Sequence, residues 1–157
     1  MDNDIRPLLE QSIEIAAPVA SVWDPVSDVR RMSEWSPQVT STRLRSSFDE
    51  VALGAQFTNR NIHGELEWTT RAEIVKFSPE TELAFRVEDN WAIWSFQLTP
   101  RAGGGALLTQ RRELPDGLSD LSKELTDGFM GGQAAFTESQ LAGMRETLEA
   151  IKAAAEA

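Results

Sequence analysis

Alternating polar and apolar residues dominate the first two thirds of the sequence. At Gln11–Ala17, Ser12 and Glu14 alternate with Ile13 and Ile15, which is the period of a β-strand with one buried face. Further strand-like runs follow, and residues favoured in turns separate most of them. The predicted strands are Gln11–Ala17, Val39–Ser47, Ala55–Ile62, Leu66–Phe77, Glu82–Val87, Trp91–Thr99 and Ala106–Leu114.

Two short helices are predicted between the first and second strands. Pro18 suits the first turn of a helix, where its missing N–H has no intrahelical partner. Apolar residues follow at helical spacing over Val19–Val26, an amphipathic pattern. Pro25 should kink this helix or end it, and Ser27–Asp28 then caps a short second helix.

The period becomes helical again toward the end of the sequence. Leu118–Gln133 predicts a helical turn or two before a glycine-containing loop. A helix of about twenty residues then ends near Ala155. One of its stripes consists of Thr137, Leu141, Met144, Leu148 and Ile151. Together the elements predict an α+β fold, in which a curved antiparallel sheet wraps a long C-terminal helix around an apolar cavity.

Composition narrows the range of partners. The 157 residues fit a single domain, 1–157. A formal charge of −10, with no basic run longer than a pair, argues against nucleic acid. Because no apolar stretch is long enough to cross a bilayer and no signal peptide is evident, we expect no membrane insertion and a cytoplasmic location. The sequence contains no cysteine, so thiolate chemistry is excluded, and we expect neither a metal nor a cofactor.

Several short segments, taken in their order along the chain, are similar to those of a known superfamily. They are Ala17–Pro18, Val22–Trp23, Asp28–Trp35, Trp68–Thr70, Ala72–Val75, Phe85, Gly103–Thr109, Gly143–Met144 and Thr147–Leu148. In this order they resemble the START-like (SRPBCC) superfamily of polyketide cyclases and lipid-transfer proteins. The resemblance spans nearly the whole chain.

The resemblance implies a helix-grip fold: a seven-stranded sheet curled over the last helix, with a pocket between them. Members of the superfamily carry lipids, sterols or hormones, close polyketide rings, or assist chaperones, so the fold alone does not assign an activity. The aromatase and cyclase branch has a polar cluster deep in its pocket, and no segment of this chain matches that cluster residue by residue.

Alternation along the strands identifies the residues that face inward. Trp94 and Phe96 share one such face, and their side chains either pack against the last helix or line a cavity. Asn59 faces inward and is either bonded to a neighbour or available to a ligand oxygen. Gln110 and Arg112 share a face with Leu108, although a bulge would replace them with Thr109 and Arg111. An inward arginine would favour a carboxylate or phenolate ligand.

His63 is the only histidine. Because Gly64 follows it, we expect His63 in an exposed hairpin turn rather than in a catalytic or metal site. Phe129 and Met130 lie among glycines, and this segment forms either a lid over the cavity or a loop fixed to the core.

The first functional hypothesis is a binding or carrier protein for a small hydrophobic molecule such as a lipid or polyketide. The alternatives are a polyketide cyclase or dehydratase, for which no catalytic residue is identified, and a protein-interaction module like the chaperone activators. The oligomeric state is left as monomer or homodimer. The expected ligand-binding residues are Trp35, Phe57, Asn59, Trp68, Thr70, Phe85, Trp94, Phe96, Gln110, Arg112, Phe129, Met130 and Phe136.

Overall fold

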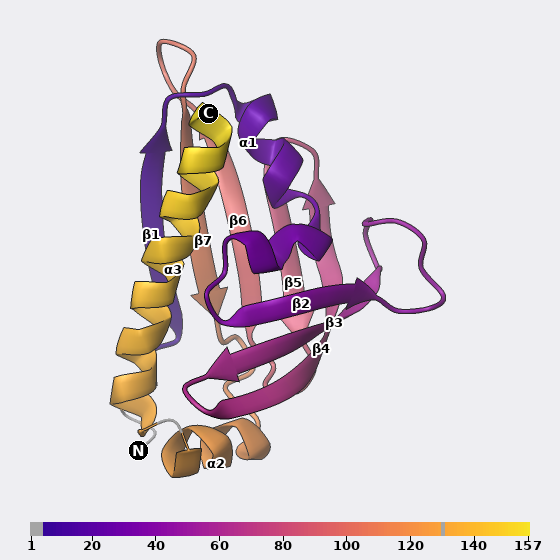
Figure 1. Cartoon of the computed structure of the whole chain (residues 1–157), viewed down its shortest axis with the longest axis vertical. Coiled ribbons are helices and arrows are strands. Elements are labelled where there is room, and N and C mark those ends of the chain that lie inside the picture. Colours follow the sequence, from indigo (N-terminus) through magenta and orange to yellow (C-terminus); the bar gives the residue numbers. More distant parts are fainter. Residues whose placement is uncertain (1–4, 130) are drawn as a thin grey trace.

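A seven-stranded antiparallel sheet and a long helix make up most of the molecule (Figure 1). The computed structural model describes residues 5–129 and 131–157. The strands are β1 (Leu8–Ile15), β2 (Val39–Leu44), β3 (Gln56–His63), β4 (Leu66–Ser78), β5 (Glu82–Val87), β6 (Ile93–Pro100) and β7 (Ala106–Glu113). The helices are α1 (Val19–Val26), the 3₁₀ helix η2 (Val29–Glu34), α2 (Asp120–Phe129) and α3 (Gln133–Glu156).

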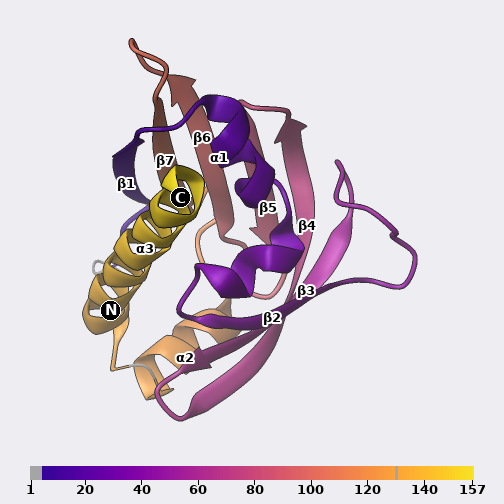
Figure 2. The ribbon, with the colours of Figure 1, turned by 45° about the horizontal axis from the view of Figure 1, so that its top comes forward.

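The strand order in the sheet is β1-β7-β6-β5-β4-β3-β2. Helix α3 lies along the β1–β7 side of the concave face, while β2, β3 and β4 curl around from the opposite edge (Figure 2). Helix α2 lies at the end of the sheet where α3 begins, close to the β3–β4 hairpin. The predicted helix-grip fold is confirmed, with its curved sheet, its two short helices after the first strand and its long last helix.

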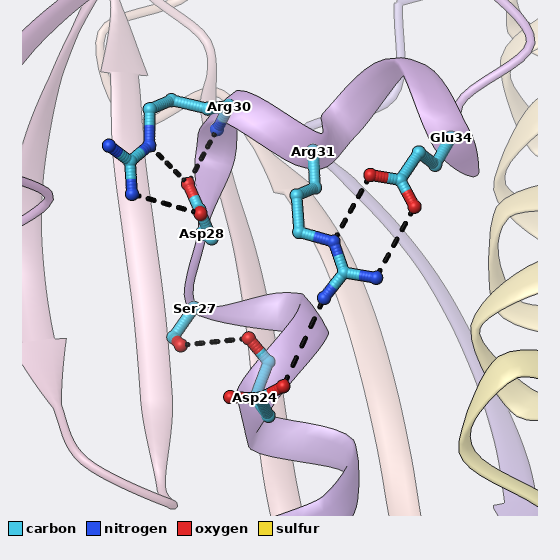
Figure 3. Close-up of polar contacts among 6 residues, drawn as sticks. All are labelled: Asp24, Ser27, Asp28, Arg30, Arg31 and Glu34. Atoms are coloured by element: carbon cyan, nitrogen blue, oxygen red, sulfur yellow. Dashed lines mark hydrogen bonds and ion pairs between the residues drawn. The ribbon is translucent and has the colours of Figure 1, made fainter.

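Pro25 lies inside α1, one residue before the helix ends. A proline there removes one intrahelical hydrogen bond. Ser27 N–H still donates to the carbonyl of Trp23 at 2.8 Å, as in a helix, and the backbone leaves the helix at Asp28, whose φ and ψ angles are −105° and 97°. Asp28 then caps η2 by accepting a hydrogen bond from Arg30 N–H at 3.0 Å (Figure 3). Pro18 is the N-cap of α1 rather than its first helical residue.

The helical segments near the end of the chain are longer than the sequence pattern indicated. Helix α2 has ten residues rather than a turn or two, and α3 has 24 residues rather than about twenty. The two helices are separated at Gly131 and Gly132, whose φ angles are 80° and 93°. Side chains rarely tolerate these angles, so the glycines allow the sharp change of direction that leads into α3.

Two clusters of buried apolar side chains form the core. One joins α1 and α3 to β1, β6 and β7 through residues such as Val22, Leu108 and Leu148. The other joins η2 to β3, β4 and β5 and contains Phe57 and Ile74. Among the described helices, none is both long enough and apolar enough to span a membrane.

Candidate functional site

A cavity of about 300 Å³ lies between the concave face of the sheet and helices α2 and α3. Its walls come from η2, the central strands and the inner faces of both helices. This volume is at the lower end of the range of roughly 300–1,000 Å³ found for small-molecule sites. The expected residues that line it are Trp35, Asn59, Trp68, Thr70, Phe85, Trp94, Phe96, Gln110, Arg112 and Phe136.

Phe57 does not line this cavity, although it was expected on its wall. Its side chain is fully buried in the second core cluster. It packs edge to face on Phe85, with 5.3 Å between ring centroids and 74° between ring planes. Phe57 thus supports the cavity wall from behind. Met130 and the side chain of Phe129 lie outside the described part of the chain, so the two alternatives for this segment, a lid over the cavity and a loop fixed to the core, both stay open.

Three polar residues of α3 that line the cavity, Gln133, Gln140 and Thr147, were not among the residues expected to bind a ligand. The cavity is lined by Gln133, Thr137, Gln140 and Thr147. Together with the buried Met144, these residues follow one another along α3 at intervals of four and three positions. This spacing places residues on one face of a helix. The helical period therefore contained the signal, but the predicted stripe took in Thr137 and otherwise apolar residues, and so left out Gln133, Gln140 and Thr147.

The end of the cavity beneath α2 was also not anticipated. Leu118, Leu121 and Leu125 line it together with Thr126. Ser119 anchors the start of α2, because its Oγ–H donates to the backbone carbonyl of Asp89 at 2.6 Å. The contact ties α2 to the turn between β5 and β6.

Trp35 is held in the cavity wall by charged residues of α1 and η2. The guanidinium carbon of Arg31 lies 5.1 Å from the Trp35 ring centroid, a cation–π contact. Arg31 is held there by Glu34, with Nε to Oε2 at 3.1 Å, and by Asp24 at 4.0 Å (Figure 3). Charged groups of α1 and η2 thus orient an aromatic ring that faces the cavity.

The inward amides of β3 are bonded to neighbouring side chains. Asn59 Oδ1 accepts a hydrogen bond from Thr42 at 2.5 Å, and Asn59 Nδ2 lies 3.6 Å from the sulfur of Met32. Asn61 Nδ2 donates to Thr70 Oγ1 at 3.1 Å. Such bonds offset the cost of burying amide groups. Of the two interpretations of Asn59, the geometry fits bonding within the protein.

Arg112 faces inward and is 4% exposed. Strands β1, β6 and β7 pair without a register shift, so the bulge that would have turned Arg111 inward is absent from these pairs. Instead, Arg111 forms an ion pair with Glu10. Arg112 Nη1 donates to Gln140 Oε1 at 3.2 Å, and its Nη2 donates to the carbonyl of Arg6. Burial lowers the pKa of Arg112 to about 10, because desolvation disfavours the charged form.

Two ionisable residues, Asp89 and Arg112, are found among the described residues that line the cavity. Asp89 accepts a hydrogen bond from Arg71 N–H at 2.6 Å, and its carboxylate lies 3.7 Å from the Arg71 guanidinium. The negative charge at the cavity wall is therefore already balanced, and the site as a whole suits recognition of polar groups on an otherwise apolar molecule.

A second hollow of about 460 Å³ adjoins the cavity. It shares Trp94, Gln110 and Gln140 with the cavity, among others, and extends past Gly143 to His63. His63 is not exposed in a turn as expected. It is the last residue of β3, half-buried.

A family model described as polyketide cyclase/dehydrase and lipid transport matches residues 6–156. Among curated proteins no match is found. A polyketide cyclase-like protein from Corynebacterium glutamicum, with a structure solved by NMR, is 31% identical; the match covers 92% of this chain and 88% of that one, with a TM-score of 0.58.

Two aromatase/cyclases have the same fold at lower sequence identity. The Zhui aromatase/cyclase from Streptomyces sp. R1128 is 15% identical with a TM-score of 0.70, and the match covers 95% of this chain and 93% of that one. The two-domain aromatase/cyclase StfQ of the steffimycin pathway is 15% identical with a TM-score of 0.74. That match covers 99% of this chain and 52% of StfQ.

Proposed function

The chain belongs to the polyketide cyclase/dehydrase and lipid transport family, and from that premise we propose that its cavity binds a small, mostly apolar molecule. The observation that carries the proposal is the composition of the walls. Trp35, Trp68, Phe85, Trp94 and Phe96 supply aromatic surface, and a few polar groups interrupt it. Apolar walls with a small number of placed polar groups are typical of small-molecule sites.

A cyclase acting on a polyketide in the same cavity is the second candidate. The likeness to the two aromatase/cyclases concerns the fold alone, but one feature of this chain favours such chemistry. The buried guanidinium of Arg112 would stabilise negative charge that develops on a bound enolate oxygen. The proton transfers would fall to water, because Asp89, the lining carboxylate, is already engaged by Arg71.

A protein-interaction module receives less support. That hypothesis is favoured by an absent cavity together with a continuous exposed apolar patch. A cavity is present, and large exposed apolar side chains of the described residues, such as Leu8, Leu53 and Val75, belong to different elements of the fold.

The binding proposal is tested with a variant in which a large side chain on α3 fills the cavity. In the Thr137→Trp variant a bulky ring replaces a small buried side chain on the cavity wall, so binding should be lost. Glu149→Trp adds the same ring to an exposed position on the same helix and should bind as wild type does.

Two measurements read out the comparison. Mass spectrometry of the denatured wild-type protein identifies any co-purified small molecule, and calorimetric titration with flat polycyclic and acyl-chain compounds measures affinity in all three proteins. Circular dichroism establishes that the variants are folded. Equal binding by Thr137→Trp and wild type, or no binding of any compound by folded wild type, contradicts the proposal.

A further inference from the structure

Three buried polar atoms on the cavity wall have no hydrogen-bond partner among the described residues. They are Gln110 Oε1, Arg112 Nε and Gln133 Nε2. A buried donor or acceptor left unpaired costs free energy, so native proteins leave few of them without a reason. All three belong to residues that line one cavity, which indicates that a bound molecule completes their hydrogen bonding.

Arg112 is also an unbalanced charge. Within the described chain, no carboxylate lies within ion-pair distance of its guanidinium, whereas the neighbouring Arg111 is paired with Glu10. The protein carries 25 acidic residues against 15 basic ones, yet this buried arginine has no acidic partner among residues 5–129 and 131–157. Burying an unpaired cation is unfavourable, and an anion in the cavity would offset that cost.

The contacts that Arg112 makes with the described residues use two of its three nitrogens. Bonds to Gln140 and to the Arg6 carbonyl occupy Nη1 and Nη2 and hold the side chain in place. The Nε–H is unused. A guanidinium N–H forms strong, charge-assisted hydrogen bonds with carboxylates.

Near Arg112, aromatic residues of β6 lie opposite polar residues of β7. Trp94 on β6 lies directly opposite Arg112 on β7, and Phe96 lies directly opposite Gln110. Side chains opposite each other on one face of a sheet are close neighbours. A molecule lying along this face would place its apolar body against β6 and its polar end against β7.

We propose that the ligand is an amphipathic carboxylic acid whose carboxylate accepts a hydrogen bond from Arg112 Nε–H while its apolar body lies against Trp94 and Phe96. This inference rests on the proposed binding function and specifies the chemical class of the ligand. Gln133 Nε2, two turns before Gln140 on α3, would donate to a separate polar group of the ligand. Gln110 Oε1 would accept a hydrogen bond from a hydroxyl on the ligand.

The test compares matched acids and amides by calorimetry at pH 7. The probes are 2-naphthoate with 2-naphthamide and octanoate with octanamide, pairs that differ in the charge of one group. Wild type should bind at least one acid about tenfold or more tightly than its amide, the difference that a charge-assisted hydrogen bond supplies. Arg112→Met should lose this preference while keeping its affinity for the amide. Arg111→Met, on the outer face of the same strand, should retain the preference.

The outcomes separate the two proposals. If folded wild type binds an acid and its amide equally well, the assignment of a carboxylate ligand is wrong and the binding function stands. If folded wild type binds none of the four probes, the binding function fails and the ligand class fails with it. A preference for the acid that survives in Arg112→Met also contradicts the inference. The wild-type comparison decides the question even if the variant does not fold.

Discussion

His63 packs edge to face against Phe136, with 5.6 Å between ring centroids and 74° between ring planes. The contact joins the end of β3 to the first turn of α3, two elements that border the cavity. Phe136 lines the cavity and His63 lines the adjoining hollow. The histidine is thus placed to fix an aromatic wall, a role that its position beside a turn glycine did not suggest.

Removing the Phe136 ring should weaken ligand binding. Phe136→Ala is expected to reduce the affinity for the better-bound naphthalene probe by roughly tenfold, because the ligand loses apolar contact worth about 1.4 kcal/mol. Phe48→Ala is the matched control, since Phe48 is also partly buried but packs against the second core cluster. Calorimetry that finds equal losses in both variants would argue against a wall contributed by Phe136.

Arg31 should stabilise the fold more than its neighbour Arg30. Arg31→Met is expected to lower the free energy of unfolding by about 0.5–1 kcal/mol, the value of a cation–π contact, because Arg31 stacks on Trp35. Arg30→Met removes a surface ion pair with Asp28 but leaves the backbone N–H that Asp28 caps, so it should cost less. Urea unfolding of both variants measures the difference, and a larger loss in Arg30→Met would contradict the prediction.

Arg112→Met should be no less stable than wild type without ligand, within about 1 kcal/mol. The reason is that the variant replaces a desolvated cation that has no acidic partner among the described residues with an apolar chain of similar length. The variant also loses the hydrogen bonds to Gln140 and Arg6, which limits any gain in stability. Thermal unfolding at pH 7 measures the effect. A large loss of stability would mean that Arg112 serves the fold rather than a ligand.

Glu156 should contribute a pH-dependent part of the stability. Its hydrogen bond from Lys152 Nζ (2.5 Å) is the main cause of a pKa below the usual 4.5, and the bond from Ala16 N–H (2.8 Å) acts in the same direction. Because the pKa is lower in the folded state, the stabilisation is fully present above about 4.5, the unfolded value, and is lost as the pH falls through the folded value.

The comparison of wild type with Glu156→Gln tests this dependence. Melting temperatures should differ near pH 7 and converge as the pH drops toward 3. Glu149→Gln, at an exposed position of the same helix, should follow wild type throughout. A difference between wild type and Glu156→Gln that stays constant over this pH range would contradict the assigned cause.

Much of the fold could be predicted because its strands alternate clearly and turn residues separate them. The predicted range Glu82–Val87 agrees with β5 at both ends. The second strand was placed too long, because β2 ends at Leu44. The loop after it is fixed by a backbone turn, in which Phe48 N–H donates to the carbonyl of Arg45 at 2.9 Å, and residue alternation does not report such a turn.

The residues on the inner face of each strand could be assigned from the sequence, but which of them reach the cavity and which are buried in the core could not. Phe57 and Asn59 share a face of β3, and alternation treats them alike. In the structure Phe57 sits under the core cluster built on η2, whereas Asn59 reaches the cavity. This difference depends on elements that pack from elsewhere in the chain. The contact between His63 and Phe136 could not be predicted from the sequence for the same reason.

The pairing of β1 with β7 has a consequence for how the protein is made. Glu10 and Arg111 bond across this pair at a separation of 101 positions. At a synthesis rate of about 5–20 residues per second, β1 waits on the order of 5–20 s after leaving the ribosome before β7 is available. Helix α3, which packs on β1, is made later still. The cavity between the sheet and α3 is therefore expected to be the last feature to close during translation, and until then the apolar face of the sheet is open to chaperones.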